Sequence, residues 1–354
     1  MIHPQIVSSI ASIGLDEQAW NALAAGSPTK SVFQTYQWMS SWERVFKERY
    51  QPWYVCAEDA SGIVGVGPLM MTRGRFGKRV LRFLGDGRAD YCDFLIRGDS
   101  RKVLNGLFEK VFAARDGWDA IELNNIPADS LTVALVEDIC RRSEYYLLQR
   151  DLYPNPVLVI KGRRDEASKI IHKAGLRRRQ NYFQRTGSLT FKTLTRDDVL
   201  PYLDRFFEQH IGRWAKTSTP SLFLDECNRT FYRELAAAMS DKAWLVMSVV
   251  EFEGRPLAMH YGFNFDGRFL WYKPSFDLAH AKHSPGLVLL KYLMEYAVTQ
   301  ECDEFDFTIG DEPFKNRFVN RVRTTVQIQI FKSSLPFALS WFMQNLSSAR
   351  RRFL

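Results

Sequence analysis

The sequence predicts an α/β (α+β) protein built from two similar domains, each with a mixed, mainly antiparallel sheet flanked by helices. Two observations predict this class. Strand-like and helix-like runs follow one another in the same order in both halves of the 354-residue chain, and the alternating run DAIEL at residues 119–123 returns as DEFDF at 303–307. The composition, 46% hydrophobic and 25% charged, is typical of a globular protein and excludes disordered, collagen-like and coiled-coil chains.

The first half opens this pattern with two strand-like runs joined by a turn. The predicted elements are strands at 53–58 and 63–71 around a turn at 59–62, a helix at 101–115, the strand at 119–123 and a helix at 129–142. Alternating acidic and apolar residues are expected of a strand with one polar face.

The second half repeats the order. The predicted elements are strands at 244–251, 256–265 and 269–272, a helix at 285–298, the strand at 303–307 and a late strand at 323–331. The dipeptide Asp266-Gly267 supplies the positive φ angles of a tight hairpin. We interpret the two halves as copies of one domain, and chance similarity of short strands is the alternative.

Further helices are predicted in the second half of the chain. Residues 165–185 predict one long basic helix ended by Gly187, and 197–214 and 225–239 predict amphipathic helices with Asp near each start. The two prolines in 153–156 mark the best boundary. We therefore expect domains at residues 1–153 and 154–332, followed by a basic and aromatic tail at 333–354.

The stretch from residue 269 to 310 is the most informative about chemistry. A strand and a loop lead into a helix opened by Ser284-Pro285-Gly286. Ser284 suits the N-cap, Pro285 suits the first helical position, and Gly286 removes a side chain where a ligand would meet the first turn. Free N–H groups and the helix dipole make such a start an anion site, although the same residues also simply begin a helix well.

Short motifs along the chain together resemble a known superfamily. They are residues 33–38 (FQTYQW), 85–96 (GDGRADYCDFLI), 176–187, 210–214 (HIGRW), 254–258 (GRPLA), 276–277, 284–286, 306–310 (DFTIG) and 314–315. In their order and spacing the chain resembles the GNAT (N-acetyltransferase) superfamily, in particular the CelD/BcsL-type acyltransferases, over residues 30–330. These proteins look like two fused GNAT-like domains and are similar in architecture to the FemABX peptidyltransferases.

The resemblance implies two tandem GNAT-like domains, with the active one in the second half. It implies transfer of an acyl group from acetyl-CoA or another acyl-CoA, without a metal, to an amine or hydroxyl of a sugar or cell-envelope precursor. The loop at 281–286 has one glycine, where GNAT enzymes have a glycine-rich turn led by glutamine or arginine. The residues predicted to bind the cofactor are Tyr272, Lys282, His283, Ser284 and Gly286.

Acyl transfer needs N–H groups aimed at the thioester oxygen and a base that takes the acceptor proton. We expect the strand at 269–272 to supply the N–H groups. Candidates for the base are His260, Asp277 and Asp306, each of which has a structural alternative as a core histidine, a turn cap or a solvated strand residue.

The acceptor is expected to contact residues from both halves. Asp90 and Asp93 match the acidic-aromatic pattern of the family, and Tyr36, Trp38 and Trp214 have the ring faces that stack on sugars. Core packing is the alternative for the three aromatic residues. Arg213 and Lys315 complete the predicted substrate-binding set.

The net charge of +8 is concentrated in two segments. Residues 161–185 contain nine Lys and Arg and two acids, and the tail at 333–354 contains three Arg and no acid. The first segment suits a nucleic acid or a phosphorylated carrier, and the tail suits peripheral contact with an anionic membrane. A solvated helix face and a helix docked on the core are the alternatives.

Five scattered cysteines without metal-ligand spacing favour a reducing compartment. The chain also has no signal peptide and no apolar run near the ~20 residues of a membrane span, so we expect a cytoplasmic protein, peripheral at the inner membrane face if the tail docks there. Two other functions remain open: a FemABX-like peptidyltransferase that uses aminoacyl-tRNA, and a non-catalytic accessory protein of polysaccharide synthesis.

Overall fold

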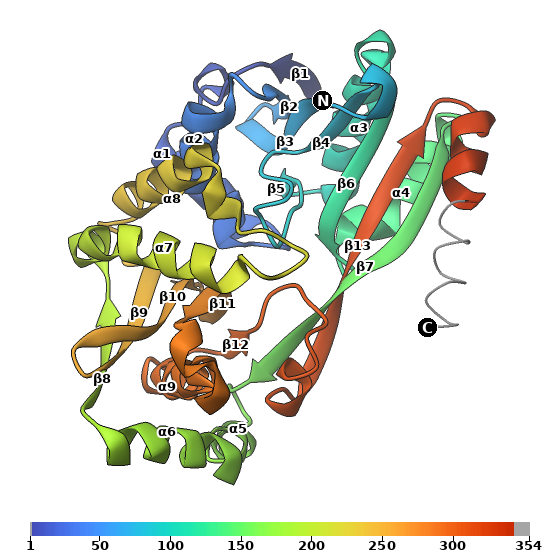
Figure 1. Ribbon diagram of the computed structural model, residues 1–354. Helices are drawn as coiled ribbons and strands as arrows, with labels where there is room; N and C mark the ends of the chain where they lie inside the picture. The colour runs from blue at the N-terminus through green and yellow to red at the C-terminus, as the bar shows by residue number, and fades with distance from the viewer. Residues whose placement is uncertain (1, 343–354) are drawn as a thin grey trace. The chain divides into compact units, whose positions relative to one another are not determined.

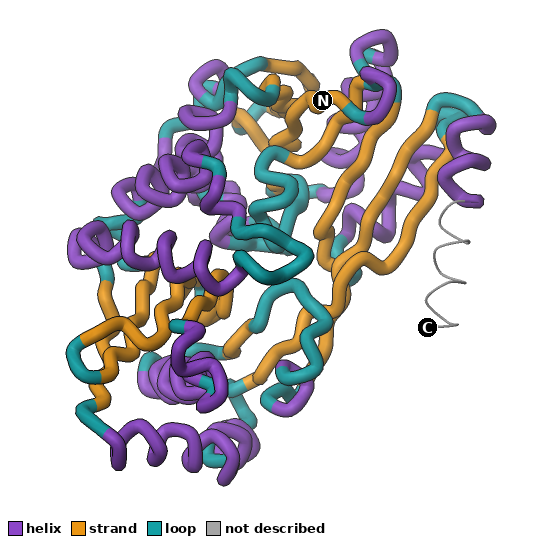
Figure 2. The backbone as a smooth tube through the Cα atoms, viewed as in Figure 1, coloured by secondary structure: helices purple, strands orange, loops and turns teal. Residues whose placement is uncertain are grey.

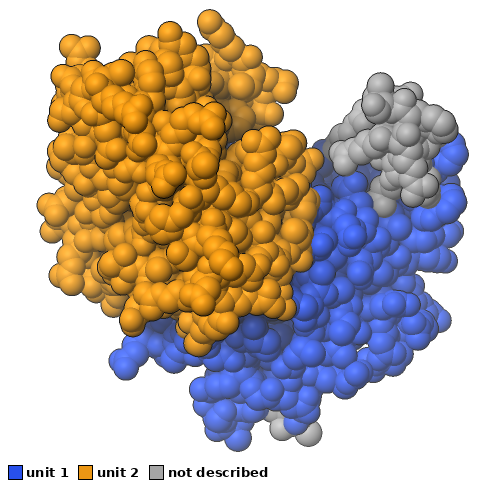
Figure 3. Space-filling model, turned by 90° about the horizontal axis from the view of Figure 1, so that it is seen from below, with its two compact units in different colours: residues 1–153, 324–354 blue, residues 154–323 orange. Residues whose placement is uncertain are grey.

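The computed structural model describes residues 2–342, and the rest of the predicted tail, 343–354, lies outside the described residues. The chain forms two compact units (Figure 3). Unit 1 is Met1–Tyr153 with Thr324–Leu354, and unit 2 is Pro154–Arg323. Residues 324–332 therefore belong to unit 1, whereas the predicted second domain at 154–332 includes them.

Unit 1 is a sheet with helices (Figures 1 and 2). Its elements are β1 His3–Val7, α1 Glu17–Gly26, α2 Tyr36–Phe46, β2 Gln51–Asp59, β3 Gly62–Arg73, β4 Arg79–Phe83, β5 Leu95–Ile96, α3 Ser100–Ala113, β6 Ala120–Pro127, α4 Leu131–Arg142 and the start of β7 Tyr146–Val159. The strand order is β1-β2-β3-β4-β6-β13-β7, with β5 paired to β3.

Unit 2 has the same plan. Its elements are the end of β7, α5 Arg164–Ile171, α6 Ala174–Thr186, β8 Leu189–Leu194, α7 Leu203–Trp214, α8 Glu226–Ala238, β9 Leu245–Phe252, β10 Arg255–Phe265, β11 Arg268–Phe276, the 3-10 helix η7 Leu278–His283, α9 Pro285–Thr299, β12 Glu304–Asp306 and the start of β13 Arg321–Phe331. The strand order is β7-β12-β11-β10-β9-β8.

The two units confirm the predicted duplication. Each has a strand, two helices, three strands, a helix and a further strand in the same chain order, and unit 1 adds the two-residue strand β5 before its last helix of this series, α3. In each, the strand after the last helix pairs in parallel, β6 with β4 and β12 with β11, while the hairpins of the three preceding strands are antiparallel. The sheets are therefore mixed and mainly antiparallel, as the sequence predicts.

Two long strands, β7 and β13, each begin in one unit and end in the other. Strand β7 starts in unit 1, but its Val157–Val159 end pairs with β12 in unit 2. Strand β13 starts in unit 2, but its residues from Thr325 to Phe331 pair with β6 in unit 1. The sequence shows neither event, because each strand pattern is continuous across the boundary.

Two predicted helices are divided. The prediction of one long basic helix at 165–185 is wrong. Helix α5 ends at Ile171, and α6 begins at Ala174. Between them, Lys173 has a ψ of 135°, which lies outside the helical range. The first turns of the predicted helix at 197–214 form a 3-10 helix, Arg196–Tyr202, before α7 begins. Pro201 lies in that segment and has no N–H to donate to a helical bond.

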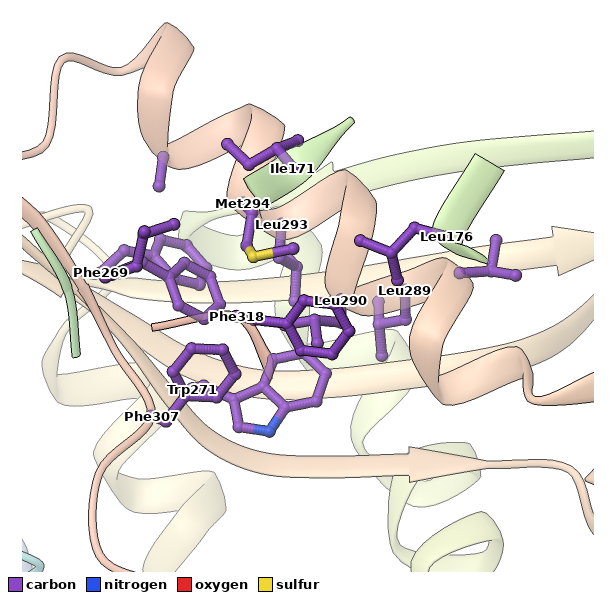
Figure 4. Close-up of a cluster of buried hydrophobic side chains, with 14 of the residues drawn as sticks. Ile171, Leu176, Phe269, Trp271, Leu289, Leu290, Leu293, Met294, Phe307 and Phe318 are labelled. Carbon is purple, nitrogen blue, oxygen red and sulfur yellow. The ribbon is translucent and has the colours of Figure 1, made fainter. Parts of the chain in front are cut away.

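The core of unit 2 fixes α9 against the sheet (Figure 4). Leu289, Leu290 and Leu293 on one side of α9 are fully buried against Phe269 and Trp271 of β11. Each such leucine stabilises the fold by about 1.5–3 kcal/mol. The packing holds the first turn of α9 close to the end of β11.

Residues 334–342 at the end of the described chain are helical. The Phe337 ring contacts Tyr146 and Phe331, while Leu335 and Leu339 are exposed. Among residues 2–342, no helix combines the length and apolar character needed to cross a bilayer.

Candidate active site

Strands β11 and β12 separate halfway along β11. They pair only at Arg268–Glu304, Phe269–Phe305 and Leu270–Asp306, after which β12 ends while β11 continues to Phe276. Beyond the paired part, the Thr308 hydroxyl donates to the Trp271 carbonyl at 3.3 Å. The second half of β11 is therefore an edge that β12 does not cover.

A bulge on β11 begins at the same place. The register with β10 shifts between Tyr261 and Phe263, and the Tyr272 N–H donates instead to Nε2 of His260 at 3.0 Å. The His260 ring is fully buried and stacks on Trp271, with ring centroids 5.0 Å apart. Burial lowers the pKa of His260 to about 3, so the imidazole is neutral. These contacts favour a structural role for His260, and they occupy one N–H group of the strand expected to face the thioester.

The start of α9 lacks a side-chain cap. Ser284 stands at the N-cap position with φ 57° and ψ 56°, and its hydroxyl caps no N–H, contrary to the expected capping role. Pro285 is the first helical residue, as predicted, and the Leu287 N–H donates to the Ser284 carbonyl. A Cβ on Gly286 would lie 3.3 Å from Cδ1 of Phe276. Gly286 therefore permits close packing of the helix start on the end of β11.

The corresponding helix start in unit 1, that of α3, is capped by an acidic side chain. The Asp99 carboxylate accepts the Lys102 N–H at 3.1 Å and so places a negative charge at the start of α3. An acidic cap competes with any anion for that position. Of these two corresponding helix starts, that of α9 is the one without a side-chain cap.

Helix α6 lies beside the loop that leads into α9. The His283 ring stacks on Tyr182 of α6, with centroids 3.7 Å apart. Desolvation, together with Lys282 and His280, lowers the pKa of His283, so His283 is a poor cationic partner for phosphate. Lys282 is exposed and makes no ion pair with a described residue, as is true of Arg178 and Arg185 on α6.

A cavity of about 370 Å³ opens beside the end of β11. Its lining comprises Arg205, Glu208, Gln209, Gly212, Arg213, Pro256, Phe276, Asp277 and Leu278. Asp277 follows β11 directly, and its Oδ1 accepts the Ala279 N–H at 2.9 Å, which leaves Oδ2 for a ligand. Arg213 donates to the Pro274 carbonyl and lies 4.6 Å from the centroid of the Phe276 ring.

Sequence motifs predicted Arg213 and Asp277 as site residues but not the other polar residues that line this cavity. Arg205, Glu208 and Gln209 lie on one face of α7, because Glu208 and Gln209 follow Arg205 by three and four residues. This polar stripe on an amphipathic helix was the available signal. A solvated helix face has the same pattern, so spacing alone does not distinguish the two.

Comparison with known proteins identifies this part of the chain. Residues 172–316, all within unit 2, match the model of an acetyltransferase (GNAT) domain. Unit 2 contains a GNAT acetyltransferase domain. The match confirms the predicted GNAT-type acyltransferase, and no curated protein sequence matches the chain.

Solved structures resemble the whole chain in fold. FemX, 10% identical, aligns with a TM-score of 0.66 over 94% of this chain and 98% of its own. The structure of L-PGS from Bacillus licheniformis, 13% identical, aligns with a TM-score of 0.57 over 93% of this chain and 96% of its own. The likeness to FemX confirms the expected similarity in architecture to FemABX proteins. At these identities the likeness concerns the fold alone.

Other predicted residues of the GNAT domain lie in internal contacts. Asp306 is buried, and its Oδ1 accepts the Thr308 N–H at 2.7 Å. Lys315 is also buried and donates to the carbonyls of Phe307 and Ile309, so it holds the loop after β12.

The remaining aromatic candidates of the GNAT domain also contact neighbouring side chains. The Tyr272 hydroxyl lies 2.7 Å from that of Tyr232, and the Trp214 ring lies 5.3 Å from the Arg213 guanidinium. Among residues 2–342, no three His, Cys, Asp or Glu side chains form a group that holds a metal.

The four candidates outside the GNAT domain lie in unit 1. Trp38 is fully buried edge-on to Phe33, and Asp90 is buried. The Tyr36 ring lies edge-on to Trp20, with centroids 6.3 Å apart. Asp93 accepts hydrogen bonds from the hydroxyls of three residues, Thr29, Ser130 and Thr132. This network gives Asp93 a structural role that the acidic-aromatic pattern did not reveal.

Proposed function

We propose that unit 2 transfers an acyl group from a coenzyme A thioester, acetyl-CoA or another acyl-CoA, to an amine or hydroxyl of a sugar or cell-envelope precursor. The observation that carries the proposal is the start of α9, which has no side-chain cap, beside the part of β11 that does not pair with β12. Backbone N–H groups at such a start favour a diphosphate, and a strand that separates from its neighbour leaves a place for an extended pantetheine arm.

The donor site is supported by charge. Pro285 has no N–H and the Leu287 N–H is used within the turn, so the Gly286 N–H remains without a partner among the described residues. The exposed Lys282 precedes this turn and supplies a positive charge. Gly286 and Lys282 would hold the diphosphate, while Ser284 supplies a hydroxyl that makes no cap bond.

Asp277 is the candidate base that lines a cavity, whereas His260 and Asp306 are buried in internal contacts. In the proposed step the acceptor nitrogen or oxygen attacks the thioester carbon, which forms a C–N or C–O bond and breaks the C–S bond. The acceptor proton passes to Asp277 and then to the departing thiolate, so the carboxylate is regenerated. Asp277 both orients the acceptor and moves its proton.

Gly286→Glu is expected to weaken acetyl-CoA binding by at least about tenfold, because it places a carboxylate against the phosphates. Gly286→Gln is the matched control, since it adds the same bulk beside Phe276 without charge. Isothermal titration with acetyl-CoA measures both variants. Equal affinities for the two variants would remove the diphosphate from this helix start.

A second candidate function, transfer from aminoacyl-tRNA, is favoured by α6. Arg177, Arg178 and Arg185 are exposed there without ion pairs to described residues, and Tyr182 forms an aromatic platform with His283. Unpaired arginines beside stacked rings are typical of surfaces that bind RNA.

Arg178→Glu with Arg185→Glu is expected to leave acetyl-CoA affinity within about threefold under the first function. Under the second, the double variant binds tRNA more weakly, and the salt slope of that binding falls by about two. Filter binding with bulk tRNA at several salt concentrations makes the measurement. Arg163→Glu with Arg164→Glu on α5 is the control for net charge.

Membrane contact and an accessory role stay predictions. The exposed Leu335 and Leu339 support a membrane contact of the C-terminal helix, and three arginines, Arg350, Arg351 and Arg352, follow in the sequence.

A further inference from the structure

The cavity between α7 and the end of β11 is lined by four charged side chains that have no ionic partner. Arg205 and Arg213 are positive, Glu208 and Asp277 are negative, and none forms an ion pair with another described residue. Three neighbouring charges behave differently, because Arg233 of α8 forms ion pairs with both Asp204 and Glu226. The four lining charges are therefore available to a ligand.

The two most enclosed of these charges are held in place. Arg213 is half-buried, with its guanidinium over the Phe276 ring and one N–H donating to the Pro274 carbonyl. The turn bond to Ala279 positions the Asp277 carboxylate. Fixed charges of both signs around one cavity are arranged for a ligand that carries both signs.

We propose that this cavity binds the acceptor as a small zwitterion, with its ammonium group beside Glu208 and Asp277 and its carboxylate beside Arg205 and Arg213. The chemical class is an α-amino acid or a short peptide with a free amine. The volume of about 370 Å³ suits a molecule of this size. The role of the ligand as the acceptor rests on the proposed acyl transfer, whereas the binding of a zwitterion in this cavity does not depend on that function.

The position of Asp277 connects the cavity with the proposed donor site. Phe276 lines the cavity, and the same ring lies against Gly286 at the start of α9. An amine beside Asp277 is thus separated from that helix start by one aromatic residue. A polyphosphate is a poorer occupant of the cavity, because Glu208 and Asp277 repel it.

The test is binding without donor to the full chain. The probes are the common L-amino acids and glycyl dipeptides, each compared with its N-acetylated and its C-amidated form, by titration calorimetry. For a zwitterion that binds, Arg213→Gln and Glu208→Gln are each expected to weaken binding about tenfold. The amidated form should no longer respond to Arg213→Gln, and the acetylated form should no longer respond to Glu208→Gln.

Lys216→Gln, which removes an exposed charge just after α7, is the control and should leave the affinity unchanged. Glu208 is exposed, so its variant folds even if that of Arg213 does not. The proposal is overturned if no zwitterion binds at millimolar concentration, or if a blocked form binds as tightly as the free one. A zwitterion that binds but is not acylated from any acyl-CoA would leave the binding site in place and remove only its role as the acceptor site, whereas a failure of acyl-CoA to bind would overturn the proposed function alone.

Discussion

Asp277→Asn is expected to lower kcat for acyl transfer by about 10²–10⁴-fold, because the amide cannot accept the proton of the attacking acceptor. The amide oxygen can still accept the Ala279 N–H, which the Asp277 Oδ1 accepts at 2.9 Å, so the turn at the start of η7 is retained. Release of coenzyme A thiol from acetyl-CoA, in the presence of amine acceptors, measures the rate.

Asp198→Asn is the control for Asp277→Asn, since Asp198 is an exposed acid in the 3-10 helix before α7. Its kcat should match that of the wild type. If Asp277→Asn keeps the wild-type kcat while Asp277→Ala lowers the melting temperature, Asp277 serves only as the cap of η7. The proton would then need another acceptor.

Acid is expected to destabilise unit 2 through two buried histidines. Burial lowers the pKa of both His210 and His260 to about 3, from about 6.5 in the unfolded chain. Since the unfolded state binds the extra protons, the stability that these neutral rings provide is complete above pH 6.5 and is lost as the pH falls towards 3. Each histidine contributes a slope of up to about 1.4 kcal/mol per pH unit across that window.

His210→Asn with His260→Gln tests this slope. The amides can mimic the ring nitrogens that contact the Ser221 hydroxyl and the Tyr272 N–H, but they do not titrate. Urea unfolding between pH 7 and pH 4 should show a flatter decline for the double variant than for the wild type. His172→Gln, at an exposed position of the same unit, is the control. Parallel declines would contradict the assignment of neutral buried rings.

Lowering the pH changes the stability of the two units in opposite directions through these buried groups. In unit 1, burial of Asp93 raises its pKa, and this effect outweighs the hydrogen bonds from Ser130, Thr132 and Thr29. The folded form of unit 1 therefore gains a proton more readily than the unfolded form, and this group makes unit 1 more stable as the pH falls. Through these groups, acid should therefore destabilise unit 2 and stabilise unit 1.

Much of the fold follows from local patterns. The sequence predicts the start of α9 at Pro285 and the hairpin at Asp266-Gly267, because each depends on neighbouring residues. It also predicts the duplication, because the run DAIEL returns as DEFDF. The break before α6 has no such signal, because Lys173 carries neither a capping side chain nor a proline. The exchange of β7 and β13 is a long-range event that no local pattern encodes.

The candidate site was predicted less completely. A histidine in an apolar strand has the same sequence pattern whether it faces a substrate or accepts a backbone N–H, and only the bulge opposite Gly262 shows that His260 does the latter. Asp277 was one of three residues that the sequence offered as the base, with His260 and Asp306. Asp277 is distinguished from the other two because it lines a cavity. Glu208 and Arg205 became candidates only when α7 was placed against β11.

The crossing of β7 and β13 has a consequence for biosynthesis. A ribosome that has translated residues 1–153 has already supplied β4 on one side of β6 but not β13 on the other, because β13 ends at Phe331. The nascent chain must therefore wait, with an unpaired sheet edge of the kind that invites aggregation, until β13 has been translated after the whole of unit 2.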